Sequence, residues 1–256
     1  SEPMTASSGY SEDHLLSLLS RINYDYDDKY YISANYRRDG SSRLGANTRW
    51  GNFWSVSAAW RLSQEAFMKN LTYVDDLKLR VSYGINGTLP SKFYSHLSLF
   101  GYGFNYQDQP GSAPTTIPNP DLGWEKNENF NIGFDARLFG RLSVAFDFYN
   151  RETKDLLMDK PISAAVGVIN SSGVANMLVN VGSMRNRGFE LELKSTNIQN
   201  KDLLWTTSLN IGHNKNKLTK LDGEQQEIIS GVSIHRVGQP YYSIYAYEYA
   251  GVDPQT

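Results

Sequence analysis

The chain has 256 residues, no cysteine and a formal net charge of −2 at pH 7, and aromatic residues make up 13% of it. The lack of cysteine excludes disulfides, thiolate metal ligands and thiol nucleophiles. The near-neutral charge provides no field to attract nucleic acid or an anionic membrane surface. The sequence has no run of about 18 apolar residues that would predict a transmembrane helix.

Segments in which apolar and polar side chains alternate recur along the chain. They predict β-strands, because successive residues of a strand point to opposite faces of a sheet. Eight alternating segments predict an all-β fold, at 17–27, 30–38, 51–62, 77–85, 127–138, 142–150, 187–197 and 203–212. The connection between the third and fourth of them, 63–76, is long enough for a single helical turn.

The connections between these strands sort by length. When consecutive strands are antiparallel, alternate connections lie at the same end of the sheet. One end then holds the short connections 27–29, 139–141 and 198–202, with 63–76. The other end holds the long connections 39–50, 86–126, 151–186 and 213 onward.

This sorting separates two fold classes. Greek-key sandwiches have no reason to sort their loops in this way, whereas outer-membrane barrels have short turns on one side and long loops on the other. A ten-residue strand tilted by roughly 45° spans about 24 Å, close to the apolar band of such barrels. The sequence therefore predicts part of an antiparallel up-and-down transmembrane β-barrel, about eight to ten strands of a larger one.

Each predicted strand has one apolar and one polar face. Alternation alone leaves open whether the apolar face packs inside a soluble sandwich or meets lipid. Large rings at both strand ends, such as Tyr26, Trp60 and Trp205 beside the short connections, favour membrane interfaces. An Arg or Lys facing lipid costs about 2–4 kcal/mol at the bilayer midplane. The basic residues of the polar faces are therefore expected to line a wet lumen: Arg61, Lys78, Arg80, Arg137 and Lys194.

The sequence contains no recognisable catalytic constellation. Phosphate-loop, HExxH and GxSxG motifs are absent from it. The four histidines, His14, His96, His213 and His235, lack metal-ligand spacing. We therefore expect neither an enzyme nor a cofactor or metal site.

The long connection 86–126 holds the candidate ligand-binding residues. Loops of this length are usually functional or disordered. Its rings Tyr102, Phe104, Tyr106 and Trp124 could stack on a sugar or grip a peptide. The alternative is that these rings pack the loop onto itself.

The two ends of the chain lead us to expect a piece of a longer protein. It begins with "SEPMTASSGY", which has no initiator methionine or signal peptide, and ends with the turn-like "YAGVDPQT".

Seven further segments carry a family resemblance: "NYRRDGSSRLG", "WSVSAAWRLSQEAFM", "LKLRVSYGINGT", "NPDLGWEKNENFNIGFD", "FYNRETKDLL", "NVGSMRNRGFELEL" and "VGQPYYSIYAYEYAGVDP". In this order they resemble the barrel of the SusC/RagA family of TonB-dependent outer-membrane transporters. The resemblance extends from about residue 20 to the end of the chain.

This resemblance implies a wall segment of a large, plugged barrel in the outer membrane of a Gram-negative cell. Family members import oligosaccharides or peptides with energy from TonB, beneath a SusD-like surface lipoprotein. Residues 1–256 would all belong to one β-barrel domain, without the plug domain, the TonB-contacting segment and the terminal strands. Two alternatives stay open: a self-contained small outer-membrane barrel or adhesin, and a soluble carbohydrate-binding β-sandwich.

Overall fold

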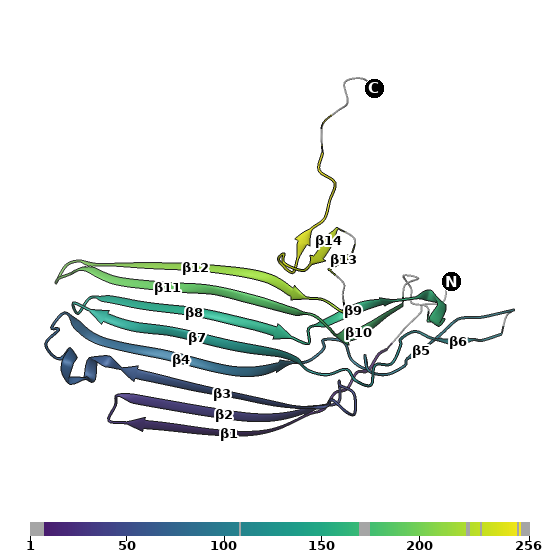
Figure 1. Ribbon diagram of the computed structural model, residues 1–256, viewed down its shortest axis with the longest axis horizontal. Coiled ribbons are helices and arrows are strands. Elements are labelled where there is room, and N and C mark those ends of the chain that lie inside the picture. The colour runs from purple at the N-terminus through teal and green to yellow at the C-terminus, as the bar shows by residue number, and fades with distance from the viewer. Residues whose placement is uncertain are drawn as a thin grey trace.

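The computed structural model describes residues 8–107, 109–168, 175–223, 226–230, 232–249 and 251. Its main feature is one antiparallel sheet of eight strands (Figure 1). All eight predicted strands are confirmed. They are β1 (Leu15–Tyr26), β2 (Tyr30–Ser41), β3 (Trp50–Arg61), β4 (Val74–Thr88), β7 (Glu125–Leu138), β8 (Leu142–Lys154), β11 (Ser183–Gln199) and β12 (Leu204–Lys220).

The strands pair in the order β1-β2-β3-β4-β7-β8-β11-β12, so each lies beside its predecessor in the chain. Short connections gather at one end of the sheet, on the left of Figure 1, and long ones at the other. Between β3 and β4 the structure has two 3₁₀ turns, η1 (Leu62–Gln64) and η2 (Ala66–Met68), in the connection that was long enough for a single helical turn. The up-and-down topology is confirmed.

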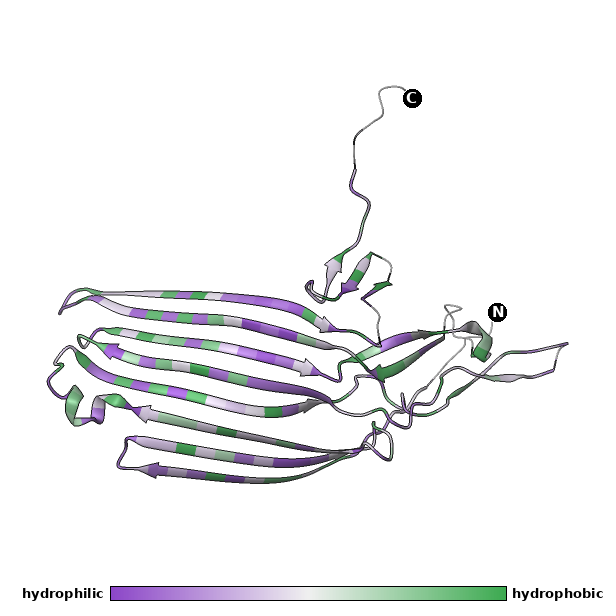
Figure 2. Ribbon diagram, viewed as in Figure 1, coloured by the Kyte–Doolittle hydropathy of each residue, from purple (hydrophilic) through white to green (hydrophobic). Residues whose placement is uncertain are grey.

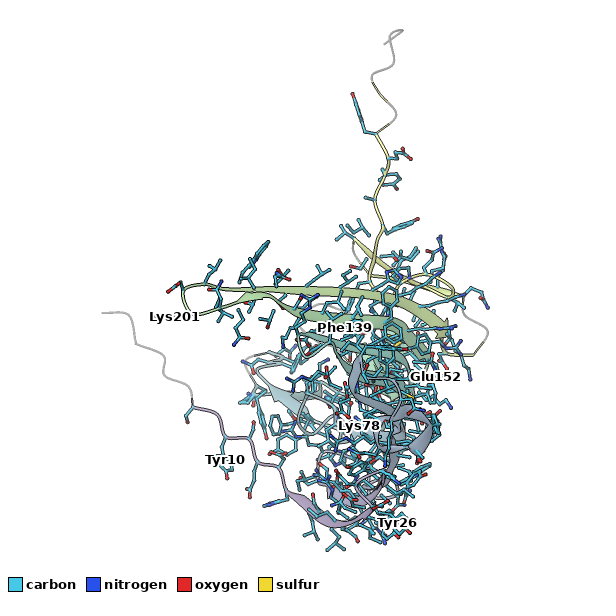
Figure 3. All side chains as sticks on the ribbon, turned by 90° about the vertical axis from the view of Figure 1, so that its left-hand side faces the viewer. Tyr10, Tyr26, Lys78, Phe139, Glu152 and Lys201 are labelled. Carbon is cyan, nitrogen blue, oxygen red and sulfur yellow. The ribbon has the colours of Figure 1, made fainter. Side chains whose placement is uncertain are left out.

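The sheet is a curved wall that does not close. Viewed along the strands, it bends between Tyr26 at the end of β1 and Lys201 in the turn before β12 (Figure 3). β1 and β12 form its two edges, and no second sheet packs against it to make a sandwich within the described residues. In the same residues, no helix is long and apolar enough to cross a membrane.

One face of this wall is apolar and open to the surroundings. The register places Tyr24, Ile32, Ala58, Val81 and Ile132 in one row across five strands. Their neighbours on the same face are also exposed, with Ile22 at 68% and Leu18 at 61%. A soluble sheet buries such a face, so this exposure fits a wall in contact with lipid.

The apolar band crosses the strands obliquely. Trp60 on β3 stands in register with Ile211 on β12, through Leu79, Phe134, Phe146 and Leu191. The interface ring of β12 is Trp205, six residues nearer the short turns than Ile211. A drift of about 1.2 residues per strand, at about 3.3 Å per residue and 4.8 Å between strands, corresponds to a tilt of about 40°. Transmembrane barrels have strand tilts of this size.

The long connections contain short strands that the sequence analysis did not predict. They are β5 (Phe100–Tyr102), β6 (Ser112–Pro114), β9 (Leu157–Ile162), β10 (Ala175–Asn180), β13 (Glu227–Ser230), β14 (Ser233–Arg236) and β15 (Ser243–Ile244), with the 3₁₀ turn η3 (Ala164–Val166). They form two hairpins and a three-stranded sheet at the long-loop end (Figure 1). Most of the buried apolar residues lie at this end, because the wall itself has no interior.

Candidate functional site

The polar face of the wall carries an Arg–Asp network. Arg80 on β4 donates from Nε and Nη2 to the two carboxylate oxygens of Asp135 on β7, at 2.8 and 3.0 Å. It also donates from Nη1 and Nη2 to Asp147 on β8, at 3.1 and 3.0 Å. One guanidinium thus donates to two carboxylates, which are acceptors for paired N–H donors, and Lys78 Nζ lies 3.9 Å from Asp135 Oδ2 as a second positive charge. The network joins three neighbouring strands.

A second network lies nearer the short turns. Arg61 Nε is 2.9 Å from Asp76 Oδ1, and its Nη1 is 2.8 Å from Asp28 Oδ2. Arg61, Lys78, Arg80, Arg137 and Lys194 all share the polar face by the strand register. All five basic residues predicted to lie on this face are therefore found there.

Amide side chains form a hydrogen-bonded ladder on the same face, towards the long loops. Asn129 donates to Asn86 at 2.6 Å and accepts from Arg151 at 2.7 Å. Asn127 accepts from Thr153 at 2.8 Å and donates to Thr88 at 2.9 Å. Such a surface offers donors and acceptors to an uncharged polar ligand.

The rings predicted at the short-turn interface lie on the apolar face. Tyr26, Tyr30 and Trp60 stack in sequence, with ring centroids 6.4 and 6.2 Å apart. In the connection that follows β3, Glu65 accepts hydrogen bonds from Tyr30 and Trp60, and these bonds lower the pKa of the Glu65 carboxyl. The arrangement ties the aromatic belt to the turn.

Trp124 lies at the base of the 86–126 connection and is buried, with 7% of its surface exposed. It packs edge-on against Phe53 at 5.1 Å between ring centroids, in a cluster with Leu44 and Leu122. Its indole Nε1 donates to the backbone oxygen of Arg49 at 3.0 Å. The structure thus places Trp124 apart from the other three candidate rings.

Tyr102, Phe104 and Tyr106 lie at the far end of the same connection. Tyr102 ends β5 and is 88% exposed, and Tyr106, just beyond, is 76% exposed. Phe104 is less exposed and sits beside Gly101. The β5–β6 hairpin extends away from the wall in Figure 1, and the exposure of Tyr102 and Tyr106 leaves both rings open to the surroundings.

The sequence analysis missed one aromatic cluster near the end of the described chain. The rings of His235, Tyr241 and Tyr242 lie 4.5 to 5.5 Å apart between centroids. Burial raises the pKa of the Tyr241 phenol. Spacing alone could not reveal this cluster, because the turn between β14 and β15 brings the rings together. Among the described residues, no group of three or more His, Asp and Glu side chains is placed to hold a metal ion.

Comparison with known proteins decides the family. Residues 4–249 match the family described as "TonB dependent receptor-like, beta-barrel". The chain belongs to this family. It is a family of receptors and transporters rather than a class of enzymes.

Individual relatives place the chain more closely within this receptor family. It is 40% identical to TonB-dependent receptor P39 of Formosa agariphila over 93% of its own length, and 33% identical to TonB-dependent receptor SusC of Bacteroides thetaiotaomicron over 91%. The solved RagAB peptide transporter superposes with a TM-score of 0.86 and 37% identity, covering 96% of this chain and 27% of that one. These similarities confirm the SusC/RagA resemblance. The chain spans about a quarter of the length of the curated relatives it matches.

The wall of this receptor family has a defined orientation. It is part of a transmembrane β-barrel, so the exposed apolar face meets lipid and the face with the Arg–Asp networks meets the lumen. Figure 2 shows the alternation of apolar (green) and polar (purple) residues along the central parts of β4, β7 and β8.

Proposed function

We propose that this chain forms part of the wall of a TonB-dependent importer in the outer membrane of a Gram-negative cell. The carrying observation is the two-faced sheet: a continuous exposed apolar face and an opposite face covered by ion-paired and amide side chains. A sheet of this kind separates lipid from an aqueous passage.

The proposed cargo is an oligosaccharide or a peptide. The RagAB relative is a peptide importer, and the Asn-rich ladder on the lumen face suits both cargo classes. Sugar hydroxyls and peptide groups each donate and accept hydrogen bonds, as amide side chains do.

Partners follow from the same family membership. We propose that the complete receptor is energised by TonB and works with a SusD-like surface lipoprotein over its long-loop end. Residues 1–256 would then be one portion of a single barrel domain, with the plug domain, the TonB-contacting segment and the terminal strands supplied by other parts of the protein.

The candidate ligand contacts are the rings of the 86–126 connection. Tyr102, Phe104 and Tyr106 stand on an outlying hairpin, where rings can stack on a sugar or a peptide side chain. Trp124 would support the same site indirectly, because its packing against Phe53 holds the base of the connection in place.

Immunoblotting of outer-membrane fractions tests the proposal directly. An antibody against residues 86–126 is applied to boiled and unboiled samples. We expect a band far above the 28.9 kDa of this chain that shifts on boiling, as folded barrels do. A band of that mass in the same fraction would instead support the small barrel, and a soluble species would overturn the membrane assignment.

The cargo class requires a separate experiment. Cells with and without the receptor gene are given labelled oligosaccharides or labelled oligopeptides, and uptake is measured with TonB present and deleted. Receptor- and TonB-dependent uptake of one class identifies the cargo. Uptake of both classes that depends on neither gene would contradict the importer proposal.

A further inference from the structure

Four basic side chains lie where the apolar band of the wall ends, near the long loops and on the same face as that band. Arg185 on β11 stands directly opposite Lys217 on β12, and Arg187 stands opposite Lys215. Because side chains alternate along a strand, all four lie on the same face as Phe189, which is the lipid-facing one. Figure 2 shows these parts of β11 and β12 as purple stretches.

The positive charge of this basic cluster is poorly compensated. The carboxylate of Glu152 lies 3.8 Å from Arg185, and among the described residues Lys215 and Lys217 form no ion pair. The nearby carboxylate of Glu128 is already paired with Lys154, at 2.7 Å. Like charges directly opposite each other on neighbouring strands destabilise a sheet. A bound anion would offset the repulsion within these two neighbouring pairs.

The cluster also forms a recess with an aromatic floor. A shallow pocket is lined by all four basic residues together with Phe148 and Phe189. The guanidinium of Arg187 lies over the Phe148 ring, 5.0 Å from its centroid. This cation–π contact keeps the guanidinium beside the ring at the recess.

The height of the cluster matches the outer edge of the apolar band. Trp205 marks the opposite edge on β12, and ten residues separate it from Lys215. At a tilt of about 40° these residues rise about 25 Å, which is the thickness of the apolar band of a transmembrane barrel. Ile211 and Leu209 continue the same face below the cluster, and both are nearly half exposed.

We propose that this cluster binds the phosphate groups of an outer-leaflet glycolipid. The proposal rests on the outer-membrane placement proposed above. Arg and Lys side chains recognise phosphate through charge-assisted hydrogen bonds, and the apolar surface immediately below accommodates acyl chains. A free phosphate ion would have no use for that apolar surface, so we assign the site to the lipid headgroup.

Native mass spectrometry of the complete receptor in detergent tests this assignment. The probe is a bisphosphorylated lipid A, compared with its dephosphorylated form and with inorganic phosphate at the same concentration. We expect the double variant Lys215→Gln/Lys217→Gln to bind bisphosphorylated lipid A about tenfold more weakly than the unmodified receptor. Arg185→Gln/Arg187→Gln should behave in the same way.

The matched control removes two charges at the opposite membrane interface. Lys69 and Lys201 lie in the short connections, so Lys69→Gln/Lys201→Gln should leave lipid binding unchanged. Equal binding by all variants, or equal binding of the dephosphorylated lipid, would overturn the inference. Inorganic phosphate that binds as tightly as bisphosphorylated lipid A would also overturn it, in favour of a free-anion site.

Failure of the importer proposal would look different. If the receptor is found in the outer-membrane fraction but binds lipid A independently of the cluster, only this inference is contradicted. If the receptor is absent from that fraction, the membrane placement on which both proposals rest is contradicted. Heat-shifted gel migration checks that each variant remains folded, so a loss of binding reports the site.

Discussion

Arg80 on β4 binds Asp147 on β8 across the full width of β7. The residue between them in the register is Gly133, which pairs with Arg80 on one side and Asp147 on the other. A Cβ atom at Gly133 would lie 2.5 Å from the Asp147 carboxylate and 2.4 Å from the backbone oxygen of Phe146. The missing side chain is what allows the ion pair to span two strand spacings.

The same device recurs one hairpin further along the sheet. Tyr149 on β8 reaches over Gly188 on β11 to donate to Asn214 on β12 at 3.2 Å. A Cβ atom at Gly188 would lie 2.6 Å from the Tyr149 hydroxyl. Glycines on the lumen face therefore let long polar side chains link strands that are not neighbours.

Replacing Gly133 with alanine should destabilise the wall. The added methyl group must displace Asp147 or the β8 backbone, and we expect a loss of about 1–3 kcal/mol in unfolding free energy. Urea denaturation of the receptor, followed by loss of heat-modifiable migration, measures it. Gly212→Ala is the matched control, because its Cβ would meet no atom closer than 3.9 Å. Equal effects of the two changes would contradict the steric argument.

Arg80→Lys should weaken the network although it preserves the charge. A lysine cannot present two pairs of N–H donors to Asp135 and Asp147, so we expect a loss of about 1–2 kcal/mol, limited by partial solvent exposure. Arg137→Lys on the same face provides the control, since Arg137 has no ion pair with a described residue. Similar denaturation midpoints for both variants would show that the paired geometry contributes nothing.

Introducing arginine at two consecutive positions of β4 tests which face meets lipid. Val81 lies on the apolar face and Ser82 on the polar face, near the middle of the band. Val81→Arg should destabilise the barrel by about 2–4 kcal/mol and reduce its yield in the outer membrane. Ser82→Arg should be tolerated, because its side chain enters a wet lumen. The opposite ranking of yields would invert the assignment of the faces.

Truncating two rings of the 86–126 connection should separate packing from ligand contact. Trp124→Ala removes a buried ring from its cluster and should cost about 3–5 kcal/mol of local stability, exposing the loop to limited proteolysis. Tyr102→Ala changes an exposed side chain and should alter stability by less than about 0.5 kcal/mol. It should weaken cargo binding, measured by titration calorimetry on the purified receptor.

The outcome for Tyr102→Ala decides between the two interpretations of the hairpin. Unchanged cargo affinity in this variant, and in Tyr106→Ala, would exclude these rings as ligand contacts. Protease resistance of Trp124→Ala equal to that of the unmodified receptor would show that the cluster does not hold the loop.

The sequence alone determined the wall of this protein. Two-residue periodicity located all eight strands, because a membrane imposes a strict choice between lipid and water on successive side chains. The sorting of short and long connections determined the topology. The same periodicity assigned Arg61 and Arg80 to the polar face, where the structure places them.

The tertiary structure decided where the strands end and what their side chains bind. β12 was predicted to end at residue 212 and continues to Lys220. From Gly212 to Lys217 both faces of β12 are polar, so hydropathy no longer indicates a strand there, whereas backbone pairing with β11 continues. Likewise, no local pattern could reveal that Asp147 is a partner of Arg80, or that Trp124 is buried against Phe53. Those contacts depend on register and chain folding between segments distant in sequence, and the alternation of a single strand carries no information about them.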